Sequence, residues 1–162
     1  MTATTITFTP DSEAQFQKVV VRYPEKKAAL LPALWIAQRQ FGWLSEDVMA
    51  YVADRLGLFP AEVKSTATFY SMFYKKPMGR FHVQVCTNLS CYLRGSDELL
   101  HRCERRMGIH PGETTADGRF SLDYVECLGS CGTAPMMQVN DDFHEDLTFA
   151  KLDALLDQWE KA

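Results

Sequence analysis

The sequence lacks the features of a membrane span, an export signal or a nucleic-acid binder. Its longest apolar run covers ten residues, from Ala28 to Ala37, and contains Pro32, whereas a spanning helix needs about 20 apolar residues. The opening MTATTITFTP has neither the charged nor the apolar region of a signal peptide. Lys and Arg are scattered over a chain of net charge -4, without the basic face that a polyanion requires. We expect a soluble protein that stays where it is made, without membrane insertion or nucleic-acid binding.

Nucleotide loops and hydrolytic arrangements are also missing from the sequence. Neither G-x-G-x-x-G nor G-x-x-x-x-G-K-[ST] occurs, and the closest glycine spacing is Gly129 with Gly132. No Ser/His/Asp arrangement can be argued. We therefore expect no nucleotide site on this chain.

Charge and cysteine divide the chain into two unlike parts. Residues 1–78 hold nine Lys/Arg and seven Asp/Glu, a net charge of +2. Residues 79–162 hold eight and fourteen, a net charge of -6, together with all five cysteines. The hydrophobic content of 46% is enough for a buried core. We predict a helical module over residues 1–78 and a second domain over 79–162.

The first part predicts a small helical bundle, because no strand-like alternation occurs before residue 80. Pro32 lies inside the second predicted helix and requires either a kink or a later helix start; the pattern leaves both open. The predicted helices are one capped by Ser12 with Gln15 as its capping box, one over 26–41 ended by Gly42, one from Ser45 to Leu56 before Gly57, and one from Pro60 towards Tyr74.

The second part alternates strand and helix patterns. A strand over 81–85 delivers Cys86, and a strand over 120–125 delivers Cys127. Between them, Ser96 is predicted to cap a helix reaching Met107. Strands over 136–139 and 143–147 follow, and Thr148 caps a last helix. The order β-α-β-β-α predicts a thioredoxin-like α/β domain with a mixed sheet, so the whole chain belongs to the α+β class.

Four of the cysteines form two local pairs, each beginning where a predicted strand ends. Cys86 and Cys91 have four residues between them, and Cys127 and Cys131 have three. A binuclear iron–sulfur cluster needs four thiolates converging on two irons from short loops. An odd cysteine count in a reducing setting makes a disulfide framework the poorer interpretation. The spacing favours a [2Fe-2S] cluster held by these four residues.

Three other interpretations of the cysteines compete with the cluster. A structural zinc site usually brings C-x2-C pairs, which are missing, so zinc is disfavoured but open. A thioredoxin-like dithiol enzyme needs C-x-x-C at the start of a helix, and this sequence has no C-x-x-C. Four buried structural cysteines would not explain why both pairs follow strand ends.

The residues also resemble a known family. C-x4-C, followed after about 35 residues by C-L-G-x-C and G-x-A-P, resembles the 24 kDa [2Fe-2S] subunits of NADH:quinone oxidoreductase, or respiratory complex I, which are thioredoxin-like ferredoxins. Further resembling stretches are Gln38-x-x-x-Gly42-Trp43, residues 67–70, residues 108–115 and residues 117–120. The resemblance covers essentially the whole chain.

The resemblance implies an electron-transfer subunit with one [2Fe-2S] cluster on Cys86, Cys91, Cys127 and Cys131. It implies a partner flavoprotein subunit that binds FMN and oxidises NADH, with which the cluster exchanges single electrons. It implies a cytoplasmic location, peripheral on the inner membrane through the complex. Related subunits serve NAD-linked formate dehydrogenases and hydrogenases, so these remain alternatives, as does a zinc-stabilised interaction module.

Several other residues could be given functional roles, but their positions in the sequence favour structural ones. Cys103 shares a helical stripe with Leu99 and Met107, so we expect it in the core. The four histidines are dispersed, without the spacing of cluster ligands. The aromatic cluster (Phe69, Tyr70, Met72, Phe73 and Tyr74) is expected to be mostly core, with part of it available to a partner subunit.

Overall fold

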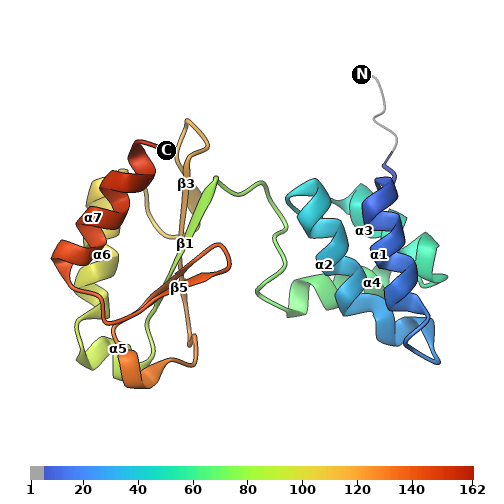
Figure 1. Ribbon diagram of the computed structural model, residues 1–162, viewed down its shortest axis with the longest axis horizontal. Coiled ribbons are helices and arrows are strands. Elements are labelled where there is room, and N and C mark those ends of the chain that lie inside the picture. The colour runs from blue at the N-terminus through green and yellow to red at the C-terminus, as the bar shows by residue number, and fades with distance from the viewer. Residues whose placement is uncertain (1–5) are drawn as a thin grey trace. The chain divides into compact units, whose positions relative to one another are not determined.

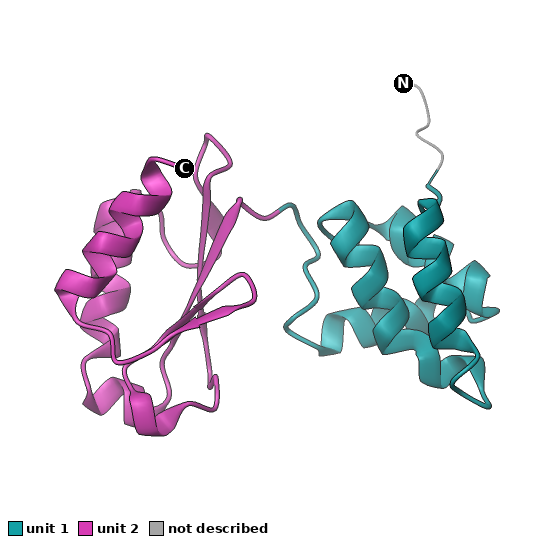
Figure 2. Ribbon diagram, viewed as in Figure 1, with its two compact units in different colours: residues 1–77 teal, residues 78–162 magenta. Residues whose placement is uncertain are grey.

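The computed structural model describes residues 6–162, which form two compact units divided between Pro77 and Met78 (Figure 2). Each unit has its own hydrophobic core. Within the described residues, no helix has the length and apolar character needed to cross a membrane. The units are called the helical unit and the sheet unit below.

The helical unit contains the predicted bundle of helices and no strand among residues 6–77 (Figure 1). Its first helix differs from the prediction at its start. Thr9, rather than Ser12, is the N-cap, and its hydroxyl accepts a hydrogen bond from the Ser12 backbone. Pro10 occupies the first turn, where its missing N–H costs nothing. The elements are α1 (Pro10–Val20), η1 (Lys26–Ala29), α2 (Leu30–Phe41), α3 (Glu46–Leu56) and α4 (Pro60–Phe69).

The structure resolves the two alternatives at Pro32 in favour of a later start. A 3-10 turn over Lys26–Ala29 precedes α2, which begins at Leu30, so Pro32 falls in the first helical turn. The first four N–H groups of a helix have no intrahelical partner, and proline is tolerated there. Gly42 ends α2 with φ 80°, and Ser45 caps α3 through the Val48 N–H, both as predicted.

Helix α4 ends at Phe69, earlier than predicted, because the buried Gln38 side chain of α2 hydrogen-bonds the backbone of the following residues. The Gln38 amide donates to the Met72 carbonyl at 2.9 Å and accepts from the Tyr74 N–H at 2.7 Å. These bonds satisfy backbone groups of the turn that follows the helix, where the Phe73 N–H also donates to the Tyr70 carbonyl at 3.2 Å. The expectation that the aromatic cluster is mostly core was therefore wrong: Phe73 is fully buried, but Phe69 is 80% exposed.

The sheet unit contains a five-stranded mixed sheet of order β2-β3-β1-β4-β5. The central pair β1 and β3 is parallel, and the other pairs are antiparallel. Helices α6 and α7 cover one face of this sheet (Figure 1). The elements are β1 (Phe81–Cys86), α5 (Leu89–Leu93), α6 (Ser96–Met107), β2 (Glu113–Thr114), β3 (Phe120–Val125), η2 (Cys131–Thr133), β4 (Met137–Val139), β5 (Asp142–His144) and α7 (Phe149–Glu160). The α+β class and the mixed sheet are confirmed.

Helices α6 and α7 are fixed to the sheet by apolar burial and to each other by charge. Cys103 on α6 and Leu152 and Leu156 on α7 are fully buried in the core of this unit. On the outer side, Asp153 accepts from Arg102 at 2.8 Å and from Arg106 at 3.1 Å. Thr148 caps α7 through the Lys151 N–H, as predicted.

Several local details of the sheet unit escaped prediction. Gly95, with φ 89°, is the N-cap of α6, whereas Ser96 is its first helical residue. The short α5 and β2 were not predicted, because five and two residues are too short to show a period. The hairpin strands cover fewer residues than predicted and turn at Asn140, with φ 56°.

Candidate functional site

The parallel pairing of β1 and β3 brings the two cysteine loops to one edge of the sheet. Cys86 is the last residue of β1 and pairs with Val125, the last residue of β3, two residues before Cys127. The Thr87 N–H then donates to the Val125 carbonyl at 3.0 Å, which holds the start of the first loop. Because parallel strands end at the same edge, both loops leave the sheet side by side.

Cys86 and Cys91 form the buried half of the site. They are 2% and 1% exposed, and they pack with Ala134, Met136 and the partly buried Leu128. Their thiols lie close enough for Cys86 to affect the ionisation of Cys91. Desolvation by burial, followed by the Cys86 interaction, raises the pKa of the Cys91 thiol to about 11. A group of positive charge at this position would favour the thiolates.

Helix α5 provides the turn that returns Cys91 to Cys86. The Tyr92 N–H donates to the Asn88 carbonyl at 2.8 Å, and the Gly95 N–H donates to the Tyr92 carbonyl at 2.9 Å. While Cys91 points inward, the helix leaves Leu89, Tyr92 and Leu93 at least 58% exposed. The site is therefore bordered by apolar side chains that nothing in the described residues covers.

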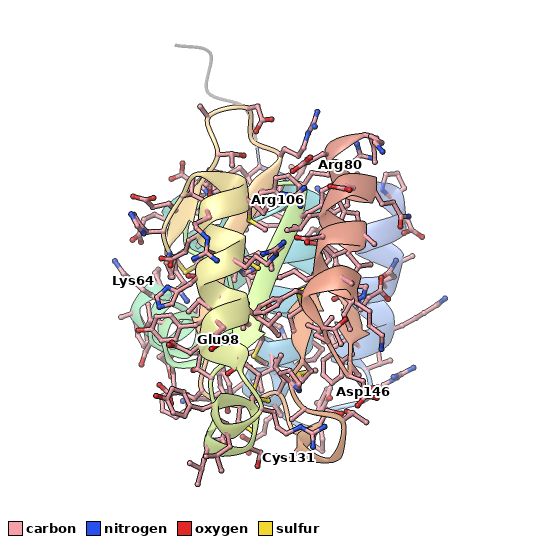
Figure 3. All side chains as sticks on the ribbon, turned by 90° about the vertical axis from the view of Figure 1, so that its left-hand side faces the viewer. Lys64, Arg80, Glu98, Arg106, Cys131 and Asp146 are labelled. Atoms are coloured by element: carbon pink, nitrogen blue, oxygen red, sulfur yellow. The ribbon has the colours of Figure 1, made fainter. Side chains whose placement is uncertain are left out.

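Cys127 and Cys131 form the exposed half of the site. The Gly129 N–H lies 3.3 Å from the Cys127 sulfur, which Gly129 reaches with φ 81°. Cys131 begins η2 and lies close enough to Cys91 to raise its pKa through a coulombic interaction. Figure 3 places Cys131 at the end of the sheet unit opposite Arg80. The described contacts join Cys86, Cys91 and Cys131, but none joins Cys127 to another cysteine.

The four cysteines supply the number and kind of donors that a binuclear cluster requires. Among residues 6–162, no group of three His, Cys, Asp or Glu side chains lies close enough to hold a metal ion. A [2Fe-2S] cluster divides four thiolates between two irons and gains from backbone N–H groups near sulfur, such as that of Gly129.

Met136 is a residue of the site that the sequence pattern did not single out. Its carbonyl accepts from the Cys86 N–H at 3.2 Å, and the nearby Met136 backbone acts to lower the pKa of Cys91. Its side chain is fully buried against both cysteines. No local sequence signal marks it, because Met136 reaches the cysteines only through the pairing of β4 with β1.

The other sulfur and imidazole groups have structural surroundings. Cys103 is fully buried in the core of the sheet unit, as predicted, and desolvation raises the pKa of its thiol to about 12. His82 lies 2.9 Å from Asp123, and His101 and His110 both contact Glu104. His144 packs edge-on against Trp159.

The chain is similar to known proteins over most of its length. The chain is 48% identical to a subunit of NADH-quinone oxidoreductase from Rhizobium meliloti (strain 1021), over 91% of this chain and 88% of that protein. It is 42% identical to an NADH-quinone oxidoreductase subunit from Rickettsia felis (strain ATCC VR-1525 / URRWXCal2), over 97% and 96% of the two chains.

The fold is also similar to a crystal structure of an NAD+-reducing [NiFe]-hydrogenase in the air-oxidized state. The TM-score is 0.73 at 27% sequence identity, over 82% of this chain but 23% of the hydrogenase chain. This similarity confirms the predicted fold. Residues 16–160 match the family described as thioredoxin-like [2Fe-2S] ferredoxin. The chain therefore belongs to the thioredoxin-like [2Fe-2S] ferredoxin family.

Proposed function

We propose that the chain is the electron-transfer subunit of an NADH:quinone oxidoreductase, with one [2Fe-2S] cluster on Cys86, Cys91, Cys127 and Cys131. The observation that carries this proposal is the meeting of two cysteine loops at the shared end of β1 and β3. The names of relatives that are 42–48% identical support the parent complex. When bound, the cluster supplies one-electron chemistry, because it accepts or releases a single electron.

Each local pair is proposed to hold one iron. Cys86 and Cys91 are close enough to interact, and burial among Ala134 and Met136 shields them from water. Cys127 and Cys131 lie on a loop that keeps them exposed. The chain thus places one half of the site inside the fold and the other half at its surface, where an electron can reach a partner.

A partner must split the electron pair of NADH. Hydride transfer delivers two electrons together, and a flavin is the usual converter to single electrons. This sequence has no glycine-rich nucleotide loop for either molecule. We propose that the partner is a flavoprotein subunit that binds FMN and NADH, and that the assembled complex holds this chain on the cytoplasmic side of the inner membrane.

The face around α5 is the proposed contact with that flavoprotein. Leu89, Tyr92 and Leu93 are 68%, 58% and 75% exposed, directly beside the buried Cys91. A docked partner would bury these side chains and bring its cofactor near the cysteines. Exposed apolar groups bordered by polar residues are typical of protein interfaces.

Cysteine replacement with spectroscopy tests the ligand assignment. The purified chain should contain two irons and two sulfides and show a [2Fe-2S] EPR signal when reduced. Serine at Cys86, Cys91, Cys127 or Cys131 should disturb or abolish that signal. Cys103→Ser, with Cys103→Ala as a second control for the buried site, should leave it intact. A normal signal in a ligand variant, or bound zinc without iron and visible colour, would contradict the proposal.

Anaerobic addition of NADH tests whether NADH oxidation requires the flavoprotein partner. The visible absorption of the cluster should stay unchanged until the flavoprotein is supplied, and should then bleach. Rapid bleaching by NADH alone would reveal a nucleotide site on this chain.

A second candidate, a subunit of an NAD+-reducing hydrogenase, is favoured by the structural similarity reported above. Co-purification of a NiFe protein, rather than quinone-linked subunits, would select it.

A further inference from the structure

The loop that carries Cys131 is attached through the Glu145 carboxylate to the segment that directly follows β5. The Thr133 hydroxyl donates to Glu145 Oε1 at 2.6 Å, and the Ser130 hydroxyl donates to the same oxygen. Ser130 precedes Cys131 and Thr133 follows it, so the Glu145 side chain binds the loop on both sides of the proposed ligand.

Backbone bonds from the neighbours of Glu145 continue this attachment. The Asp146 N–H donates to the Thr133 carbonyl at 2.8 Å, and the Leu147 N–H donates to the Pro135 carbonyl at 2.9 Å. Asp146 adopts φ 47°, a conformation that non-glycine residues seldom take. Cys131 and Asp146 lie at the same end of the unit in Figure 3. The segment thus keeps an uncommon backbone conformation while three consecutive residues bind the loop.

We propose that Glu145 is a positioning residue for the Cys127–Cys131 loop and that its negative charge lowers the reduction potential of the bound cluster. This inference rests on the proposed function. Reduction adds an electron to a cluster whose loop is hydrogen-bonded to this carboxylate, and the repulsion favours the oxidised state.

The ionised state of Glu145 is consistent with this geometry. The hydrogen bonds from Ser130 and Thr133 hold the pKa of its carboxyl below the ordinary value. The carboxylate is therefore charged at neutral pH, where the electron transfer would take place.

Two replacements separate the charge from the hydrogen bonds. Glu145→Gln keeps a carbonyl oxygen for both hydroxyls and removes the charge, whereas Glu145→Ala removes both. Asp141→Asn is the matched control, because it removes an exposed carboxylate at the other end of the hairpin. There, the adjacent Asn140 side chain donates to the Arg80 carbonyl.

The experiment is a redox titration of the holo-protein, followed by EPR, with the rate of iron loss to a chelator measured in parallel. Glu145→Gln should raise the reduced-to-oxidised ratio at a fixed potential by roughly threefold or more, and Asp141→Asn should change it far less. Glu145→Ala should also shorten the half-time of iron loss by roughly threefold or more relative to Glu145→Gln.

The outcomes distinguish this inference from the proposed function. A wild-type chain without a [2Fe-2S] signal would overturn the proposed function itself. A wild-type signal with equal ratios in Glu145→Gln and wild type would overturn the role of the charge. Equal rates of iron loss in Glu145→Ala and Glu145→Gln would overturn the positioning role. If Glu145→Ala does not fold, Glu145→Gln still decides the effect on the potential.

Discussion

Replacement of Glu13 by glutamine should remove a pH-dependent part of the stability of the helical unit. Glu13 on α1 accepts two hydrogen bonds of 2.6 Å from Arg55 on α3, and Arg55 also donates to the Tyr51 hydroxyl at 2.8 Å. The guanidinium lies 4.6 Å from the centre of the Phe16 ring. The hydrogen bond from Arg55 is the main reason that the pKa of Glu13 falls from its ordinary value of 4.5 to about 2.

The magnitude follows from this shift and from the exposure of the pair. A tenfold change in acidity corresponds to about 1.4 kcal/mol, so the shift sets a ceiling of about 3.4 kcal/mol. The Glu13 side chain is 37% exposed, and solvent screens much of this. We therefore expect Glu13→Gln to lower the free energy of unfolding at pH 7 by about 1–1.5 kcal/mol, near the upper end for a bidentate surface pair.

The pH dependence gives the decisive comparison. Because the pKa of Glu13 is lowered on folding, its contribution is present above pH 4.5 and is lost as pH falls towards 2. Urea unfolding followed by circular dichroism should show a difference between wild type and Glu13→Gln that falls by more than half between pH 7 and about pH 3. Glu46→Gln, which breaks the exposed pair with Lys64, should have little effect at either pH. A difference that is the same at both pH values would refute the electrostatic explanation.

Two further predictions concern the unit boundary and the surface of α6. Limited proteolysis should cut near Lys75 to Gly79 and release residues 1–78 from 79–162 as folded fragments; cleavage only at the termini would contradict two independent domains. At the end of α6, His101 and His110 both hydrogen-bond Glu104, and this bond is the main reason that the pKa of each histidine is raised. The pKa of Glu104 is lowered in turn, mainly by its hydrogen bond with His101. The histidine contribution is therefore fully present below pH 6.5 and lost above the raised values, and the Glu104 contribution is lost below pH 4.5. His110→Gln should reduce the loss of stability between pH 6 and pH 9, measured by urea unfolding, and an unchanged loss would contradict this.

The elements whose own residues determine them were predicted from the sequence. Gly42 and Gly57 end helices with φ of 80° and 67°, and Ser45 and Thr148 cap helices through local hydrogen bonds. The positions of β1, β3 and the β4–β5 hairpin along the chain also followed from the alternation of apolar residues, whereas their order in the sheet was not predicted. In each case the deciding interactions lie within a few residues in the sequence, and a local pattern is enough to reveal them.

The features that were missed depend on contacts between distant residues. Gln38 interrupts the predicted continuation of α4 through bonds to a segment more than 30 residues away. Met136 joins the site only because β4 pairs with β1 across about 50 residues of sequence. Gly79 approaches the backbone of β3 so closely that a Cβ atom would lie 2.6 Å from the Phe120 carbonyl carbon. The cysteine spacing indicated the kind of site, but the burial of one pair and the exposure of the other required the fold.

The pairing of β1 with β3 has a consequence for the biogenesis of the protein. The proposed ligands come from loops separated by α6, β2 and β3, and a chain emerging from the ribosome carries Cys86 and Cys91 well before Cys127 and Cys131 exist. Until β3 is synthesised and pairs with β1, half of the donor set is missing and the first two thiols have no shared edge. All four proposed ligands are therefore present only after translation has passed Cys131, and binding of the cluster is coupled to the folding that pairs β1 with β3.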